Sequence, residues 1–285
     1  MIKTIASTPF LDTVAAFESI STVTSKNKLR ELLSSTGVTF YDTEKNFIKE
    51  ASVSICGFGG LGFDFTSQST DSVIPIRDTS SLLSYTDIKN MFNPLQATGG
   101  FMSYLNTGNL DSDKMISVMA EHGHYSTLHL SYINIAIFGI SSLVENEINC
   151  QRDMMHIARI TEARTGVQSQ PPLAVLYPEQ VEFFKEVYTK TQKVRAAMPK
   201  KVGSSKRDFF ESSNSIYSGA KGTGVIISIT LKNLMKLISL LDDSGKEEEF
   251  KRVLLQLSKI THTLWPHFFK SPNKYSYTLP EHLEK

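Results

Sequence analysis

Apolar residues occupy both alternating faces of one segment in the middle of the chain, residues 128 to 140. One face carries Leu128, Leu130, Tyr132, Ala136, Phe138 and Ile140, and the other carries Ile133, Ile135 and Ile137. A strand with apolar residues on both faces is typical of a sheet interior that is covered on two sides. We therefore expect an interior strand at Leu128–Ile140, with shorter strands at Ser52–Cys56 and Val73–Ile76.

Two amphipathic patterns predict helices after this strand. Ser142-Leu143-Val144-Glu145 has the S-x-x-E spacing of a capping box, which satisfies the free amides of a helix start. We expect this helix to run past Arg152, with a core face formed by Val144, Ile148, Met155 and Ala158. A second helix is expected after Pro178 and should end at Pro199. Its apolar stripe is Phe183, Phe184, Val187, Thr191, Val194 and Met198.

Two further helices are predicted near the C-terminus. The first has the stripe Leu231, Leu234, Met235, Ile238 and Leu241. A second capping box, Ser244 to Glu247, predicts the start of the last helix, which should end at Trp265-Pro266. Its core face is Phe250, Val253, Leu254, Leu257, Ile260 and Leu264. The tail from Ser271 is expected to be extended or mobile.

The remaining patterns are weaker. Residues 1 to 50 are predicted to be helical in pieces, most clearly at Lys26–Leu33. Gly99-Gly100 is interpreted as a turn between helical fragments, and residues 200 to 224 as a polar connection. The whole pattern indicates an α+β fold without a sharp linker, and hence one domain over residues 1–285.

Composition excludes several classes of protein. The 285 residues are 40% hydrophobic and 21% charged, which is ordinary for a folded chain. The net charge of +1 provides no overall field for a nucleic acid polymer or an anionic membrane, so any anion site must be local. Two cysteines do not form a disulfide framework. We find neither a signal peptide nor a span long enough to cross a bilayer, and we expect a cytoplasmic protein.

Two motifs invite a functional interpretation that their context does not support. Residues 57 to 62 fit G-x-G-x-x-G, and Asp78 follows at about the spacing of a ribose-binding acid. The sequence after Gly62 has no helical period, so a Gly-rich turn is favoured over a dinucleotide site. His122, His124 and His129 suggest a metal, but no nearby acid or cysteine completes a ligand set. Histidines that hydrogen-bond a cofactor or the backbone are the favoured interpretation.

Two clusters could bind an anion. Gln151, Arg152, His156, Arg159 and residues 161 to 165 place three arginines and a histidine close together. Arginine suits phosphate because its planar fork donates two hydrogen bonds, although a solvated helix face is the alternative. Residues 218 to 224 could form a nest of backbone amides with Lys221 as a point charge, and a flexible loop is the alternative there.

These segments resemble the flavin-dependent thymidylate synthases. Gly123-His124-Tyr125-Ser126 is similar to the family's G-H-x-S/T turn, and residues 150 to 152 stand at its R-H-R position. Arg164 resembles the last arginine of the signature that follows. Residues 229 to 235 resemble the family's T-x-N-x-R-S-L helix. The likeness covers roughly residues 112–269, leaving a divergent part at 1–111 and a tail at 270–285.

The resemblance implies a ThyX-like α+β fold, with a mainly antiparallel central sheet flanked by helices and a helical C-terminal half. It implies a homotetramer that uses FAD, NADPH and methylenetetrahydrofolate to transfer a one-carbon group to C5 of a pyrimidine deoxynucleotide, dUMP or a relative. The residues that it places near the flavin are His124, Ser126, His129, Gln151 and Arg152. Those that it places near the nucleotide are Glu147, Glu162 and Arg164, of which the last two are the catalytic candidates.

Several residues depart from the family pattern. Cys150 and Gln151 replace an arginine and a histidine that hold FAD, and Leu241 stands where an arginine activates the uracil ring. Arg159 and Lys221 are candidates to bind the nucleotide from new positions. The alternative hypothesis is a catalytically inactive relative that serves as a binding or scaffold subunit. Both hypotheses expect a cationic pocket formed by residues 152, 159 and 164 at the C-terminal side of the 128–140 strand.

Overall fold

The computed structural model describes residues 38–41, 46–59, 97, 99–101, 111–159, 172–199 and 219–279. Within these residues the strands form two sheets, one ordered β3-β4-β7-β5 and the other β1-β2-β6. The four-stranded sheet comprises β3 (Ser52–Gly59), β4 (Tyr132–Ser141), β5 (Met155–Arg159) and β7 (Gly222–Thr230). All of its pairings are antiparallel, so the expected antiparallel sheet is confirmed.

The predicted interior strand is β4, which pairs with β3 on one side and β7 on the other. It begins at Tyr132 instead of Leu128, because residues Tyr125–His129 form the 3-10 helix η1. The predicted faces hold as far as Phe138. Gly139 then adopts a φ of 79° and the register shifts between Phe138 and Ile140. This bulge turns Ile140 to the core face of Ile133, which corrects the expected alternation.

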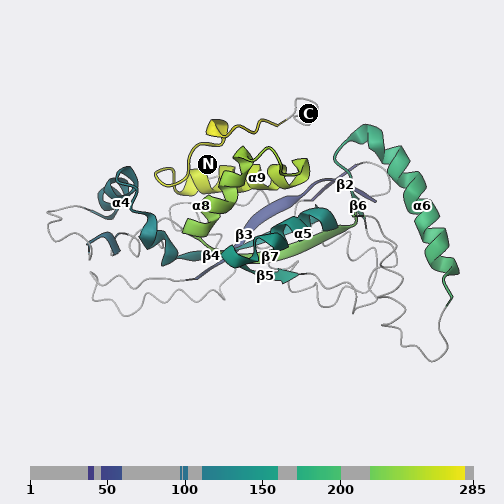
Figure 1. Ribbon diagram of the computed structural model, residues 1–285, viewed down its shortest axis with the longest axis horizontal. Coiled ribbons are helices and arrows are strands. Elements are labelled where there is room, and N and C mark those ends of the chain that lie inside the picture. The colour runs from purple at the N-terminus through teal and green to yellow at the C-terminus, as the bar shows by residue number, and fades with distance from the viewer. Residues whose placement is uncertain are drawn as a thin grey trace, which may run out of the picture.

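One hydrophobic core lies between this sheet and four helices. The helices are α4 (Ser112–Glu121), α5 (Ser142–Cys150), α8 (Leu231–Ser239) and α9 (Glu248–Leu264). Figure 1 shows α8 and α9 over one face of the sheet. The inward residues of β4 and β7 pack there against helix residues such as Val144, Leu234 and Phe250, all of which are buried.

Helix α5 differs from its prediction at both ends. Its N-cap is Ser141, whose hydroxyl accepts from the amide of Val144 at 3.2 Å, so the expected capping box at Ser142 is wrong by one residue. The helix ends at Cys150 and does not run past Arg152. Residues Arg152–Met154 form the 3-10 helix η2, and the chain then continues as strand β5, where it pairs with β7.

The second sheet contains β1 (Thr39–Phe40), β2 (Phe47–Glu50) and β6 (Leu173–Ala174), so the helix expected within residues 1 to 50 is wrong at 39–40 and 47–50. After the 3-10 helix η3 (Pro178–Gln180), α6 covers Val181–Ala197. The start at Pro178 and the end before Pro199 are confirmed. The predicted stripe is wrong at Phe183 and Val194, which are exposed, because the helix buries Val181, Tyr188 and Arg195 instead.

The C-terminal helices follow their predicted stripes. Leu231, Leu234, Ile238 and Leu241 are buried, with Leu241 in the 3-10 helix η4 (Leu240–Asp242). The last helix begins at Glu248 with Glu247 as N-cap, so the second capping box is wrong. Trp265 is its C-cap, as expected.

Of the tail that was expected to be extended or mobile, Pro272–Lys274 form the 3-10 helix η5, and residues 275 to 279 form neither helix nor strand. Tyr275 is buried in the main core. The hydroxyl of Tyr277 donates to Oε1 of Glu248 at 2.5 Å. The tail is therefore tied to α9 both by packing and by a hydrogen bond to a charged group.

Three glycine predictions are also corrected. Gly99 and Gly100 lie in a helical segment, where Gly100 lets Met115 and Met119 approach closely. Gly57 and Gly59 continue strand β3, and Gly222 and Gly224 belong to β7. The predicted elements at Lys26–Leu33 and Val73–Ile76 lie outside the described residues. In the part of the chain that the structure describes, every helix is too short or too polar to span a bilayer.

Candidate functional site

An open groove of about 500 Å³ lies where β4 begins and β7 ends. It is lined by Tyr132, Arg152, Asp153, Met154, Met155, His156, Ser228, Thr230 and Asn233. The cavity therefore lies at the N-terminal end of β4, which corrects the expected position at its C-terminal end. Its size is within the range of pockets that bind small molecules.

The N-terminus of α8 joins the two sides of this groove. The hydroxyl of Thr230 caps the helix by accepting from the amide of Asn233 at 3.2 Å. The same hydroxyl lies 3.5 Å from Nδ1 of His129, and Nδ2 of Asn233 donates to the carbonyl of Met154 at 2.8 Å. Residues 129 and 154, from segments far from α8 in the sequence, are thereby held beside one helix end.

A row of polar residues crosses the sheet at the groove. Asn134 of β4, Ser228 of β7 and His156 of β5 are register partners. Their neighbours in each strand, including Ile227 and Ile229, face the main core, so the row lies on the opposite face. A polar row next to Tyr132, with a guanidinium at the rim, suits a ligand that has both a planar ring and an anionic group.

Most polar side chains of the groove are not engaged within the protein. Across the ranges that the structure describes, the side chains of Tyr132, Arg152, Asp153, His156 and Ser228 make no hydrogen bond or ion pair. Arg152, a predicted flavin ligand, is exposed there. These groups are available to a ligand at no cost in broken intramolecular bonds.

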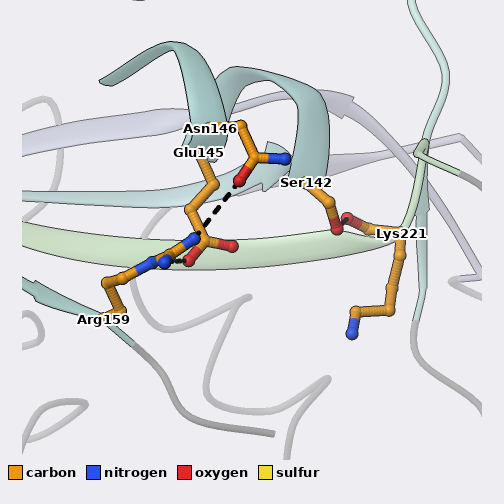
Figure 2. Close-up of polar contacts among 5 residues, drawn as sticks. All are labelled: Ser142, Glu145, Asn146, Arg159 and Lys221. Carbon is orange, nitrogen blue, oxygen red and sulfur yellow. Dashed lines mark hydrogen bonds and ion pairs between the residues drawn. The ribbon is translucent and has the colours of Figure 1, made fainter. Parts of the chain in front are cut away.

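Arg159 does not converge with Arg152 as expected. In a helix, residues 152, 156 and 159 would share a face, but in strand β5 positions 156 and 159 point to opposite faces because their separation is odd. Nε of Arg159 donates to Oε1 of Glu145 at 2.5 Å, and its NH2 group lies 3.4 Å from Oδ1 of Asn146. Figure 2 shows this guanidinium against α5. Arg159 is therefore satisfied by its own chain.

Two further candidates for nucleotide binding also have local roles. Oε1 of Glu147 lies 2.5 Å from Nζ of Lys246, and this hydrogen bond raises the pKa of Lys246. The carbonyl of Lys221 accepts from the amide and the hydroxyl of Ser142, at 2.9 and 3.1 Å. In Figure 2 the ammonium of Lys221 points away from Ser142. The predicted amide nest is not formed at Gly222 and Gly224, which are strand residues.

The other predicted residues are placed as follows. His124 is the exposed N-cap of η1, and Ser126 is an exposed residue within it. Gln151 is the half-buried C-cap of α5, next to Arg152. Glu162 and Arg164, the two catalytic candidates, lie outside the described residues.

Sequence reasoning missed Tyr132, Ser228, Thr230 and Asn233 as groove residues. A signal existed for one of them: Ser228 is a polar interruption in an otherwise apolar strand. Polar residues at such positions mark a face where the sheet is open. Among the described residues there is no group of three or more His, Cys, Asp or Glu that could hold a metal.

Comparison with known proteins finds likeness among solved structures. No family model matches the sequence, and no curated protein matches it. Among solved structures, the chain is similar to thymidylate synthase X from Helicobacter pylori, crystallised with FAD and dUMP, at a TM-score of 0.48 and 14% identity. The match covers 64% of this chain and 94% of the other. FAD and dUMP are ligands of that protein, and an identity of this order does not transfer them.

Proposed function

We propose that this protein transfers a one-carbon group to C5 of a pyrimidine deoxynucleotide, dUMP or a relative, with a flavin as redox cofactor. The supporting observation is the meeting of two distant segments at one groove. The segment at the family's R-H-R position supplies Arg152, and the helix that resembles the T-x-N-x-R-S-L motif supplies Thr230 and Asn233. Roughly eighty residues separate the segments in the sequence, so only the fold unites them.

The groove has the donors that a flavin nucleotide needs. Arg152 offers a guanidinium to phosphate, and Ser228 offers a hydroxyl that is not otherwise bonded among the described residues. Tyr132 is 42% exposed and presents an aromatic surface to a planar ring. We assign FAD to this groove, with Gln151, His124 and Ser126 as further flavin ligands. When bound, FAD would supply the electrons for the reduction, and the protein's part is binding and orientation.

The nucleotide belongs beyond β5 in this proposal. The chain that follows Arg159 leads to Glu162 and Arg164, the residues that the resemblance assigns to the nucleotide and to catalysis. Glu147, Arg159 and Lys221 lie on elements next to the end of β5, but the first two are held by ion pairs. NADPH and methylenetetrahydrofolate are the proposed co-substrates, and a homotetramer is the proposed assembly.

The test begins with the purified full chain and added FAD. We expect the flavin absorbance to correspond to about one bound FAD per chain. When dUMP, methylenetetrahydrofolate and NADPH are added, we expect a C5-substituted nucleotide, identified by mass spectrometry. Arg164→Ala should weaken nucleotide binding while the flavin spectrum is unchanged. A protein that takes up FAD but modifies neither dUMP nor dCMP would contradict the proposed reaction.

One observation favours an inactive binding subunit as a second candidate. Two of the expected substrate-binding residues, Glu147 and Arg159, are neutralised by Lys246 and Glu145. A chain that no longer binds a substrate can use such groups for its own stability. Failure to take up FAD would support this candidate and reject the enzyme.

A further inference from the structure

Three groove residues, Arg152, His156 and Ser228, carry hydrogen-bond donors that lack an acceptor among the described residues. In the described part of the chain, none of their side chains has a hydrogen-bond or ion-pair partner. Thr230 and Asn233, which line the same groove, are both bonded within the protein. The groove thus contains two kinds of polar residue, one that builds its wall and one that is left for a ligand.

His156 and Ser228 are neighbours on the open face of the sheet. They are direct register partners across β5 and β7. Side chains at such positions have Cβ atoms about 5 Å apart, so the imidazole and the hydroxyl can reach the same ligand atom or adjacent ones. His156 is exposed, whereas its neighbour Met155 is buried in the core, which directs the imidazole away from the core.

We infer that His156 and Ser228 complete, together with Arg152, a phosphate-binding site on the open face of the sheet. This inference rests on the proposed function, because the phosphate is that of the nucleotide ligand assigned to the groove. Two cation-capable side chains and a hydroxyl match the several acceptor oxygens and the charge of a phosphate or pyrophosphate group. In this site His156 binds the anion as a cation, donating from its ring.

The charges around His156 define how the site responds to pH. Arg152 and Asp153 come from η2, while β4 contributes Tyr132 and β7 contributes only hydroxyl groups. The amide of Asn233 on α8 is neutral, and His129 lies beyond Thr230. Asp153 is the carboxylate that lines the described groove, so the anion must lie on the side of Arg152 and His156. Histidine side chains ordinarily change charge between pH 5 and 8, and binding should therefore strengthen at the acidic end.

The experiment titrates the full chain with inorganic pyrophosphate in a calorimeter, at about pH 6 and about pH 8 and constant ionic strength. Pyrophosphate itself gains protons on acidification, so the readout is the pH dependence of the wild type relative to His156→Gln. We expect the wild type to gain about tenfold in affinity at the lower pH relative to the variant. Ser228→Ala should weaken binding severalfold at both pH values, as expected for loss of a neutral donor.

His122→Gln is the matched control, because His122 is exposed, bonds to the carbonyl of Val118 and lies outside the groove. It should behave as the wild type. Equal pH dependence in the wild type and His156→Gln would overturn the inference, as would absence of pyrophosphate binding to the wild type. Uptake of FAD is measured on the same samples. If the wild type takes up FAD and His156→Gln matches it in every titration, only this inference fails and the proposed function stands.

Discussion

Asn233 donates through Nδ2 to the carbonyl of Met154 at 2.8 Å and so ties the first turn of α8 to the segment that carries Arg152. The side chain is partly buried, and its loss leaves the carbonyl without this donor. Asn233→Ala should lower the free energy of unfolding by about 1 kcal/mol, measured by urea denaturation. It should also weaken FAD binding, because η2 loses its anchor.

Thr230→Val provides the companion test at the N-cap of the same helix. It removes the cap on Asn233 but leaves the bond to Met154, so it should cost about 1 kcal/mol of stability. If both variants bind FAD as the wild type does, the N-terminus of α8 does not organise the groove.

Gly139 occupies the bulge in β4 with a φ of 79°. A Cβ atom there would lie 2.9 Å from both γ carbons of Val38, on a side chain that is itself buried. Gly139→Ala should therefore cost roughly 2–4 kcal/mol, from backbone strain and overpacking together. Gly123→Ala separates the two causes, because Gly123 has a φ of 69° with nothing within 4 Å of its added Cβ. It should cost only about 1 kcal/mol. Equal losses in the two variants would show that packing around Gly139 contributes nothing.

Glu249 couples stability to pH. Burial raises the pKa of its carboxyl, although the bonds from Ser141, whose amide donates at 2.7 Å, act in the opposite direction. A carboxyl with a raised pKa in the folded state keeps its proton longer than in the unfolded chain. Its contribution to stability is therefore lost as pH rises from roughly 4.5, the value near that of an unfolded glutamate.

Glu249→Gln keeps an acceptor for the amide of Ser141 but cannot ionise. The variant should become progressively more stable relative to the wild type as pH is raised from about 5 to about 8. Chemical denaturation of both proteins across this range provides the measurement. A stability difference that does not change with pH would show that the carboxyl is not perturbed.

The docked tail should contribute to the stability of the whole protein. Tyr275 is 8% exposed and belongs to the main core, with the ammonium of Lys270 3.9 Å from its ring centre. Tyr275→Ala should cost about 3 kcal/mol in thermal or urea unfolding. Tyr277→Phe removes only the hydroxyl that donates to Glu248, and should cost about 1.5 kcal/mol. A tail that is mobile in solution would make both substitutions neutral.

The fold was predictable for helices that bury one face and for the strand that is buried on both faces. The apolar stripes of α8 and α9 repeat at the helical period, and apolar residues occupy both faces of β4, so the packing agrees with the sequence pattern. The bulge at Gly139 was not predictable, because the positive φ and the closeness of Val38, which is distant in sequence, arise only in the fold.

The site was harder to predict than the fold, because one segment that was expected to be helical forms a strand. Residues 155 to 159 have an apolar spacing that suits a helix, yet pairing with β7 makes them a strand. This pairing sends His156 to the groove and Arg159 to Glu145, which divides the expected cationic cluster. Arg152 lines the groove because it lies in η2, just before the strand, and its role as a flavin ligand stays a prediction.

The central claim is that the groove at Arg152 binds the flavin nucleotide, and Arg152→Ala compared with Arg159→Ala tests it most directly. Both variants lose one guanidinium, but only Arg152 lines the groove, while Arg159 pairs with Glu145 on the other face of β5. We predict that FAD, followed by quenching of its fluorescence, binds Arg152→Ala at least about tenfold more weakly than the wild type, and binds Arg159→Ala as the wild type does. Equal affinities for all three proteins would contradict the account.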